Sequence, residues 1–163
     1  MLNNQTQHRV YIETTIPSFY YTLRTDIESL AKQSWTRKWW KEYADQFTLL
    51  SSTAVIDELR RGTSEKTQAR IDLIKDIEML PAPSKINQIA QTYIDKSIMP
   101  QDLFGDAHHL ALASFYNADV LLTWNCKHLA NLNKIYLIRQ INQELGLPTP
   151  ELATPLNYLG ADD

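Results

Sequence analysis

The sequence contains a single cysteine, Cys126, among its 163 residues. One cysteine cannot form an internal disulfide bond, so the small disulfide-stapled secreted domains are excluded. No apolar stretch approaches the roughly 18 residues that a membrane-spanning helix requires. The polar segment from Met1 to Arg9 also lacks the apolar stretch of a secretory signal. We therefore expect a cytoplasmic protein that does not enter a membrane.

Basic residues do not dominate the chain, since 16 Lys and Arg stand against 19 Asp and Glu, which gives a net charge of −3. This balance does not favour a protein that grips a polyanion with a broadly basic surface. Basic residues do gather locally, in the segment 32–41 and at Arg60, Arg61, Lys66 and Arg70. A local basic rim therefore remains an open alternative.

Signals for β-hairpins are scarce, and short apolar runs alternate with segments of helical periodicity. This pattern predicts a single domain, residues 1–163, with a parallel sheet that helices cover on both faces. We expect strands at 10–12, 47–50, 79–80, 120–123 and 151–154. We expect helices starting near Thr14, over 25–44, from the caps at 51–53 to Gly62, and over 63–76, 84–96, 106–116, 126–130 and 133–145.

The helix expected over 25–44 carries apolar residues at spacings of three and four, as one buried face of an amphipathic helix requires. These residues are Ile27, Leu30, Ala31, Trp35, Trp39 and Tyr43. Trp40 falls outside that face. The tryptophans, interleaved with lysine and arginine, could instead form a stacking platform for single-stranded RNA, although burial is the favoured interpretation.

Four short segments place an oxygen ligand where an apolar run ends or a helix begins. The carboxyl ends of neighbouring parallel strands converge on one crevice, where α/β sheets place their sites. A cluster of hard oxygen ligands there suits Mg²⁺ or Mn²⁺. The segments are Val10-Tyr11-Ile12-Glu13, Val55-Ile56-Asp57-Glu58, Gly105-Asp106 and Leu121-Leu122-Thr123-Trp124-Asn125.

The same segments carry a resemblance, through their order and spacing, to the PIN domain family. Among its members the chain is most similar to the VapC-type toxins of bacterial toxin–antitoxin pairs. The quoted stretches are residues 11–18, 58–62, 105–111 and 121–125, and the similarity runs from about Arg9 to Thr154. The resemblance implies an α/β/α sandwich of three layers with a five-stranded parallel sheet. It also implies a metal-dependent ribonuclease.

Family positions carry over residue by residue. The resemblance makes Glu13, Glu58 and Asp106 the metal ligands and, with Asn125, the catalytic set. Glu13 stands where the family usually has Asp, and Asn125 stands where it usually has a fourth Asp. The longer Glu13 side chain reaches roughly 1 to 1.5 Å further, and Asn125 keeps an oxygen but loses a charge. Three carboxylates are still enough for one Mg²⁺ or Mn²⁺ ion.

Substrate contacts are expected around this set. Thr14 or Thr15 could hydrogen-bond the first carboxylate or a phosphate oxygen, and Thr123 could orient groups beside Asn125. Phosphate contacts are expected from basic residues near Glu58, namely Arg60, Arg61, Lys66 and Arg70, and a solvated helix face is the alternative interpretation of the same residues. We predict an endoribonuclease that hydrolyses RNA phosphodiester bonds as the toxin of a toxin–antitoxin pair. It is expected to form a homodimer and to bind a cognate antitoxin.

Two alternatives remain open. The first is a non-catalytic PIN-like domain that binds RNA or a protein partner through the same cleft. The second is a zinc hydrolase, because Asp106 and His109 share one helical face, and His128 could join them as a nitrogen ligand. A buried His109 that orients its helix is the favoured interpretation of that residue.

Overall fold

In the computed structural model, which describes residues 7–160, five parallel strands form one sheet in the order β3-β2-β1-β4-β5. The strands are β1 (Arg9–Ile12), β2 (Thr48–Ser52), β3 (Glu78–Leu80), β4 (Val120–Leu122) and β5 (Glu151–Ala153). The helices are α1 (Thr15–Tyr20), α2 (Ile27–Glu42), α3 (Thr53–Arg61), α4 (Thr67–Ile74), α5 (Ser84–Asp95), α6 (Asp106–Phe115) and α7 (Leu132–Glu144), with 3-10 turns η1 (Ala44–Gln46) and η2 (Pro155–Tyr158).

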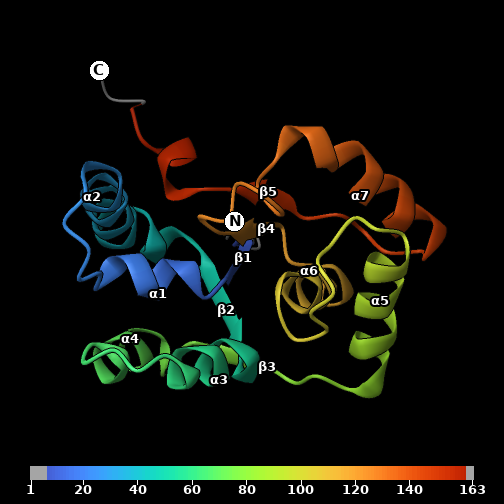
Figure 1. Cartoon of the computed structure of the whole chain (residues 1–163). Coiled ribbons are helices and arrows are strands. Elements are labelled where there is room, and N and C mark those ends of the chain that lie inside the picture. The colour runs from blue at the N-terminus through green and yellow to red at the C-terminus, as the bar shows by residue number, and fades with distance from the viewer. Residues whose placement is uncertain (1–6, 161–163) are drawn as a thin grey trace, which may run out of the picture.

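Helices lie on both faces of the sheet, so the molecule has three layers. Helices α1 to α4 lie on one side of the strands and α5 to α7 on the other (Figure 1). The predicted α/β/α sandwich with a five-stranded parallel sheet is therefore confirmed. Each connection between neighbouring parallel strands crosses over through helices, as parallel pairing requires.

The alternation of side chains along β1 divides the core in two. Tyr11 faces α5, α6 and α7, where it packs in a cluster with residues such as Leu110 and Ile138. Val10 and Ile12 face the opposite way and pack with Trp39 of α2 and its neighbours. Successive side chains of a strand point to opposite faces of the sheet, so one short strand serves both cores.

Three expectations about helices are wrong in detail. The segment 126–130 forms turns and no helix. The backbone carbonyl oxygen of Asn125 accepts the amide hydrogens of both Leu129 and Ala130 there. The helix expected over 63–76 begins at Thr67. In α2, Ile27 and Leu30 are 88% and 47% exposed, because the face that the helix buries carries Ser29, Thr36 and Trp39.

No helix within the described residues is both long and apolar enough to cross a membrane. The expectation of a single domain over 1–163 and the absence of a secretion signal in Met1 to Arg9 stay predictions. Residues 1–6 and 161–163 lie outside the described part of the chain.

Candidate active site

The candidate site lies where the strand order reverses. From β1 the chain builds β2 and β3 to one side, whereas β4 pairs with β1 on the other side. Crevices of α/β sheets form at such a switch point, beyond the carboxyl ends of the strands. Glu13 follows β1, and its amide bonds to Leu122 at the end of β4, at 3.2 Å. Thr123 follows β4, so the two residues meet at this edge.

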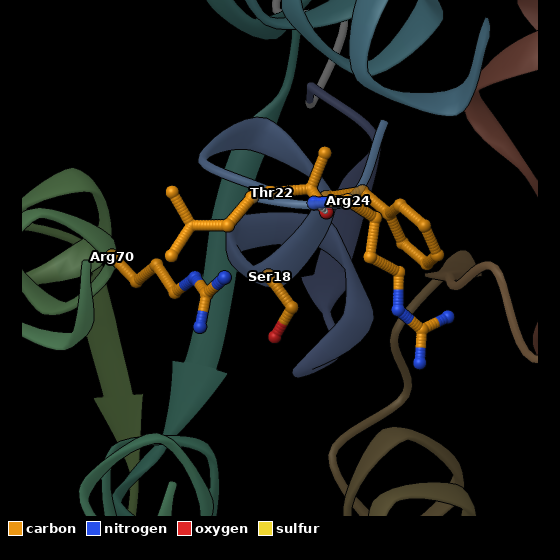
Figure 2. A pocket seen from close by; sticks show the side chains of 6 residues that line it. Ser18, Thr22, Arg24 and Arg70 are labelled. Atoms are coloured by element: carbon orange, nitrogen blue, oxygen red, sulfur yellow. Dashed lines mark hydrogen bonds between the residues drawn. The ribbon is translucent and has the colours of Figure 1, made fainter. Parts of the chain in front are cut away.

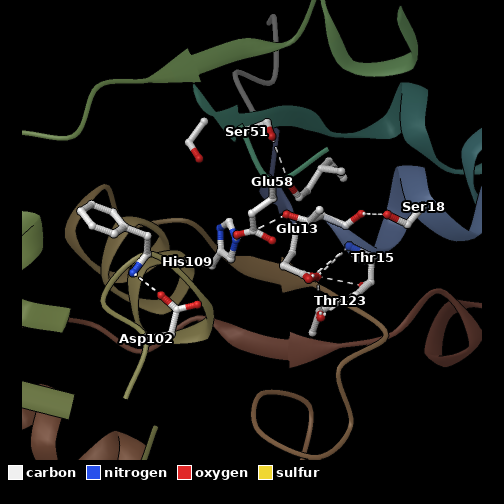
Figure 3. Close-up of polar contacts among 12 residues, drawn as sticks. Glu13, Thr15, Ser18, Ser51, Glu58, Asp102, His109 and Thr123 are labelled. Atoms are coloured by element: carbon white, nitrogen blue, oxygen red, sulfur yellow. Dashed lines mark hydrogen bonds and ion pairs between the residues drawn. The ribbon is translucent and has the colours of Figure 1, made fainter. Parts of the chain in front are cut away.

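The carboxylate of Glu13 is buried and accepts hydrogen bonds from three donors. The Thr15 amide lies 2.9 Å from Oε2 and the Thr15 hydroxyl 2.8 Å from it. The Thr123 hydroxyl donates to the same oxygen at 3.0 Å. Thr15 also accepts the Trp124 amide hydrogen, at 2.7 Å. The threonines predicted to bind substrate therefore tie the first carboxylate to the end of β4, as Figure 3 shows.

The second carboxylate, Glu58, is held by a histidine. Oε1 of Glu58 lies 2.6 Å from Nε2 of the buried His109, and the Glu58 side chain is 25% exposed. Nδ1 of His109 lies 2.8 Å from the hydroxyl of Tyr11, which in turn lies 2.8 Å from Oγ of Ser52. An ionised carboxylate can only accept, so Nε2 carries a proton. A buried hydrogen-bonded chain thus links α6, α3, β1 and β2.

Charge and burial have opposite effects on the pKa values of the groups in this hydrogen-bonded chain. Burial by itself works to raise the pKa of Glu58, but the hydrogen bond and charge of His109 outweigh it and hold that pKa below its usual value. Burial works to lower the pKa of His109, but the hydrogen bond to Glu58, followed by the charges of Glu58 and Glu13, raises it. For the more deeply buried Glu13, burial wins over the charge of His109 and raises its pKa.

Asp106 begins α6 and is partly exposed. It precedes His109 by three residues, so the two side chains share one face of that helix. Its charge contributes to the raised pKa of His109. The negative charge at the first turn of α6 is also favourable with respect to the helix dipole.

Asn125 has a local structural role in this arrangement. Its Oδ1 accepts the amide hydrogen of His128 at 3.0 Å, and its own amide donates to the Thr123 hydroxyl at 2.9 Å. The side-chain oxygen predicted to orient catalytic groups therefore caps the turn after β4. Its catalytic role stays a prediction.

The remaining predicted contacts lie around the carboxylates. Thr14 approaches the shared histidine, with its hydroxyl 3.4 Å from Nε2 of His109. Arg60 and Arg61 are exposed at the end of α3, and the charge of Arg61 helps to lower the pKa of Glu58. Their predicted role as phosphate contacts remains untested.

Within residues 7–160, no three Asp, Glu, His or Cys side chains form a group that could hold a metal ion as arranged. Glu13 faces its threonine donors, and Glu58 faces His109. The donor set nevertheless fits the expected ions by its chemistry, because carboxylate oxygens are the hard ligands that Mg²⁺ and Mn²⁺ prefer. Glu13, Glu58 and Asp106 are thus the residues that would hold such an ion, in exchange for some of these hydrogen bonds.

The alternative of a zinc site also requires at least three clustered ligands, and the described residues contain no such cluster. Nδ1 of His128 lies 3.0 Å from Nζ of Lys134, and both ring nitrogens of His109 face Tyr11 and Glu58. A histidine whose two nitrogens are engaged by protein groups has none left for a metal.

Tyr11 is the residue that the sequence analysis missed. It sits inside an apolar run, where a tyrosine is easily taken for core alone. Burial raises the pKa of its phenol well above the usual value, so the hydroxyl keeps its proton. The signal was available, because a buried tyrosine hydroxyl normally requires a hydrogen-bond partner, and His109 was a candidate.

No protein-family model matches the chain, and no curated protein matches its sequence. Two solved structures match most of it. A chain of VapBC2 from Rickettsia felis, bound to a DNA fragment from the promoter, has a TM-score of 0.52 at 14% identity, covering 90% of this chain and 98% of that one. A chain of FitAcB from Neisseria gonorrhoeae has a TM-score of 0.50 at 12% identity, with the same coverage.

At these identities the likeness concerns the fold alone. The sheet order, the helices on both faces and the match over 90% of the chain agree with one another. The predicted resemblance is confirmed at that level: this chain has the fold of the VapC-like PIN domains.

Proposed function

We propose that this protein is a metal-dependent endoribonuclease that hydrolyses RNA phosphodiester bonds. One observation carries the proposal. Glu58 of α3 contacts His109 on the face of α6 that also carries Asp106, and the charge of Glu13, which follows β1, acts on the same histidine. This concentration of carboxylates lies at the switch point of a parallel sheet, where such folds place their sites.

The residues have separable tasks in the proposed reaction. Thr15 and Thr123 hold the Glu13 carboxylate, and His109 holds that of Glu58, so both groups are oriented before substrate arrives. A bound Mg²⁺ or Mn²⁺ ion supplies a more acidic attacking water and neutralises charge on the phosphate oxygens. Asp106, which is partly exposed, remains accessible to substrate and solvent.

The fold also supports the wider proposal of a toxin. The structures that it resembles are of VapBC2 and FitAcB. By this likeness we propose that the chain is a cytoplasmic toxin, acts as a homodimer and is silenced by a cognate antitoxin protein.

The non-catalytic alternative has two observations in its favour. The Glu13 carboxylate already receives three protein donors, and Asn125 caps a turn. A PIN-like domain that binds RNA or a protein without cutting would tolerate both features.

Cleavage of a panel of structured RNAs in Mg²⁺, in Mn²⁺ and in EDTA tests the proposal. We expect cutting that needs the metal and that falls at least about a hundredfold in Asp106→Asn, since a lost transition-state contact costs that much. Asp57→Asn is the matched control, because Asp57 is an exposed carboxylate of α3 beside Glu58. No cutting by the wild-type protein with either ion, together with retained RNA binding, would establish the alternative.

A further inference from the structure

A pocket of about 440 Å³ lies between α1, the loop that follows it and α4. Figure 2 shows the guanidinium of Arg70, from α4, directed towards Ser18 of α1, with Arg24 on the other side of Ser18. The pocket combines two arginines, two hydroxyl groups and two apolar side chains, namely Ser18, Phe19, Thr22, Leu23, Arg24 and Arg70.

We infer that this pocket is a second contact site for the RNA strand, in which Arg24 and Arg70 bind a backbone phosphate next to the cleaved bond. The inference rests on the proposed ribonuclease function. Of the residues predicted from the sequence to contact phosphate, Arg70 lines the pocket, whereas Arg60, Arg61 and Lys66 lie outside it and Arg24 is new.

Neither arginine of the pocket forms an ion pair with a carboxylate of the described residues. Among residues 7–160 the ion pairs are Lys32 with Glu28 and His109 with Glu58. Asp26, close to Arg24 in sequence, instead accepts the Ser29 amide and caps α2. The charge of Arg24 helps to lower the pKa of Asp26, but without an ion pair. The pocket therefore presents two cations whose guanidinium groups are free of carboxylate partners among the described residues, and this suits an anionic ligand.

Arg70 is held in place by its surroundings. Its terminal NH2 group donates to the carbonyl oxygen of Tyr21 at 2.9 Å. Its Nε is buried, and no described group lies within hydrogen-bond distance of it. The hydrogen bond to Tyr21 thus holds the guanidinium at the pocket wall, where it can meet a phosphate oxygen.

The pocket is next to the carboxylate site along α1. The Ser18 hydroxyl donates to the Thr14 carbonyl at 2.8 Å, and Thr15 begins the helix while holding Glu13. Three residues of α-helix span about 4.5 Å along the axis. Ser18 appears in both close-ups, beside Arg70 in Figure 2 and beside Thr15 in Figure 3. A strand cleaved at the carboxylates would therefore pass this pocket.

The apolar wall also favours RNA. Phe19 is partly buried and packs edge-on against Trp124, which fixes its ring. An aromatic side chain beside arginines can stack a base while the guanidinium groups hold the phosphate. An acidic peptide would also suit two arginines, but carboxylates one helical turn away would repel its charges. A cleaved RNA has to come close to those carboxylates.

The test is binding of a fluorescein-labelled, single-stranded RNA of about 12 nucleotides, measured by anisotropy in EDTA so that no metal-dependent cutting occurs. We expect the double variant, Arg24→Gln with Arg70→Gln, to weaken RNA binding at least about tenfold. The slope of log affinity against log salt should fall by about 0.7, as expected for one lost phosphate contact. The matched control is Lys85→Gln with Arg139→Gln, exposed cations of α5 and α7 on the opposite side of the sheet.

Kinetics and a peptide probe complete the test. With Mn²⁺, the Arg24 and Arg70 pair should raise KM and leave kcat within about twofold, since uniform binding is lost. If the double variant of Arg24 and Arg70 binds and cuts RNA as the control variant does, the inference is overturned. Weakened binding of a labelled polyglutamate peptide by that double variant would then identify the pocket as a protein-docking site. If the wild-type protein cuts no RNA but the pair still loses RNA binding, the pocket stands and the nuclease proposal fails.

Arg70→Gln could disturb folding, because Arg70 donates to Tyr21. Arg24→Gln alone avoids this problem, since Arg24 is exposed and only its backbone amide, which donates to Thr22, is hydrogen-bonded in the structure. That single variant should weaken RNA binding about threefold or more. Unchanged binding in Arg24→Gln would count against the inference.

Discussion

Nε2 of His109 lies 2.6 Å from Oε1 of Glu58, and this contact joins α6 to α3 near the carboxyl ends of the strands. The imidazole is buried and also contacts the hydroxyl of Tyr11. Glu58, a residue proposed to hold the metal ion, is therefore oriented by a histidine that itself packs in the core. Stability and the proposed chemistry are coupled at this point.

Replacing the histidine should destabilise the fold. His109→Ala leaves Tyr11 and Glu58 without their partner and opens a cavity, so we expect a loss of about 2–4 kcal/mol in the free energy of unfolding. Urea denaturation measures it. His128→Ala, a partly exposed histidine at the turn after β4, serves as the control and should stay within about 1 kcal/mol. A loss from His109→Ala no larger than the control's would show that the contact does not stabilise the protein.

The pair of Glu58 and His109 should make stability depend on pH. The pKa of His109 is raised in the fold, so its stabilising contribution is complete below about 6.5, its usual value, and disappears as pH rises through the folded-state pKa. The pKa of Glu58 is lowered, so its contribution is complete above about 4.5 and disappears as pH falls through the folded-state pKa. The coupling between them should therefore peak between about 4.5 and 6.5.

A double-mutant cycle isolates this coupling. Stability is measured in EDTA for the wild type, Glu58→Gln, His109→Gln and the double variant across the pH range, and the interaction energy is taken at each pH. The cycle cancels the pH effects of groups that interact with neither residue. Glu13 interacts with both, so the loss of stability that its raised pKa adds as pH rises is part of the measured coupling. An interaction energy that does not change with pH would contradict the expectation.

The hydroxyl of Thr123 should be needed to hold the carboxylate of Glu13 in place and to stabilise the fold. Thr123→Val keeps the shape but removes the buried hydroxyl that donates to Glu13 and accepts from Asn125. We expect a loss of about 1–3 kcal/mol, the cost of leaving buried polar groups unpaired. Thermal unfolding compares it with Thr25→Val, an exposed threonine before α2. Equal midpoints for the two variants would mean that Glu13 needs no hydroxyl from β4.

The packing of α2 gives a prediction of a different kind. Trp39 is fully buried and Ile27 is 88% exposed on the same helix. Trp39→Ala should cost about 3–5 kcal/mol, whereas Ile27→Ala should change stability by no more than about 0.5 kcal/mol. Urea denaturation measures both free energies of unfolding. Similar losses for the two variants would contradict this expectation and would support the apolar face predicted from the sequence.

The fold could be predicted because its signals are local. Alternating short apolar runs and helical periods identify parallel strands and helices, and each predicted strand is present within one or two residues. The α2 face was wrong at Ile27 and Leu30 because apolar spacing does not show that the first turn buries the polar Ser29 instead. The turns at 126–130 depended on one asparagine, whose backbone and side-chain contacts periodicity does not describe.

The sequence by itself determined the sheet, its layers and the order of Glu13, Glu58 and Asp106 along the chain, because those features follow from hydrophobic period and chain order. Only the tertiary structure decided the partners of those carboxylates. His109 lies 51 residues from Glu58 and 98 from Tyr11, and Thr123 lies 110 from Glu13. Contacts over such separations arise when strands pair and helices dock, and no local pattern encodes them.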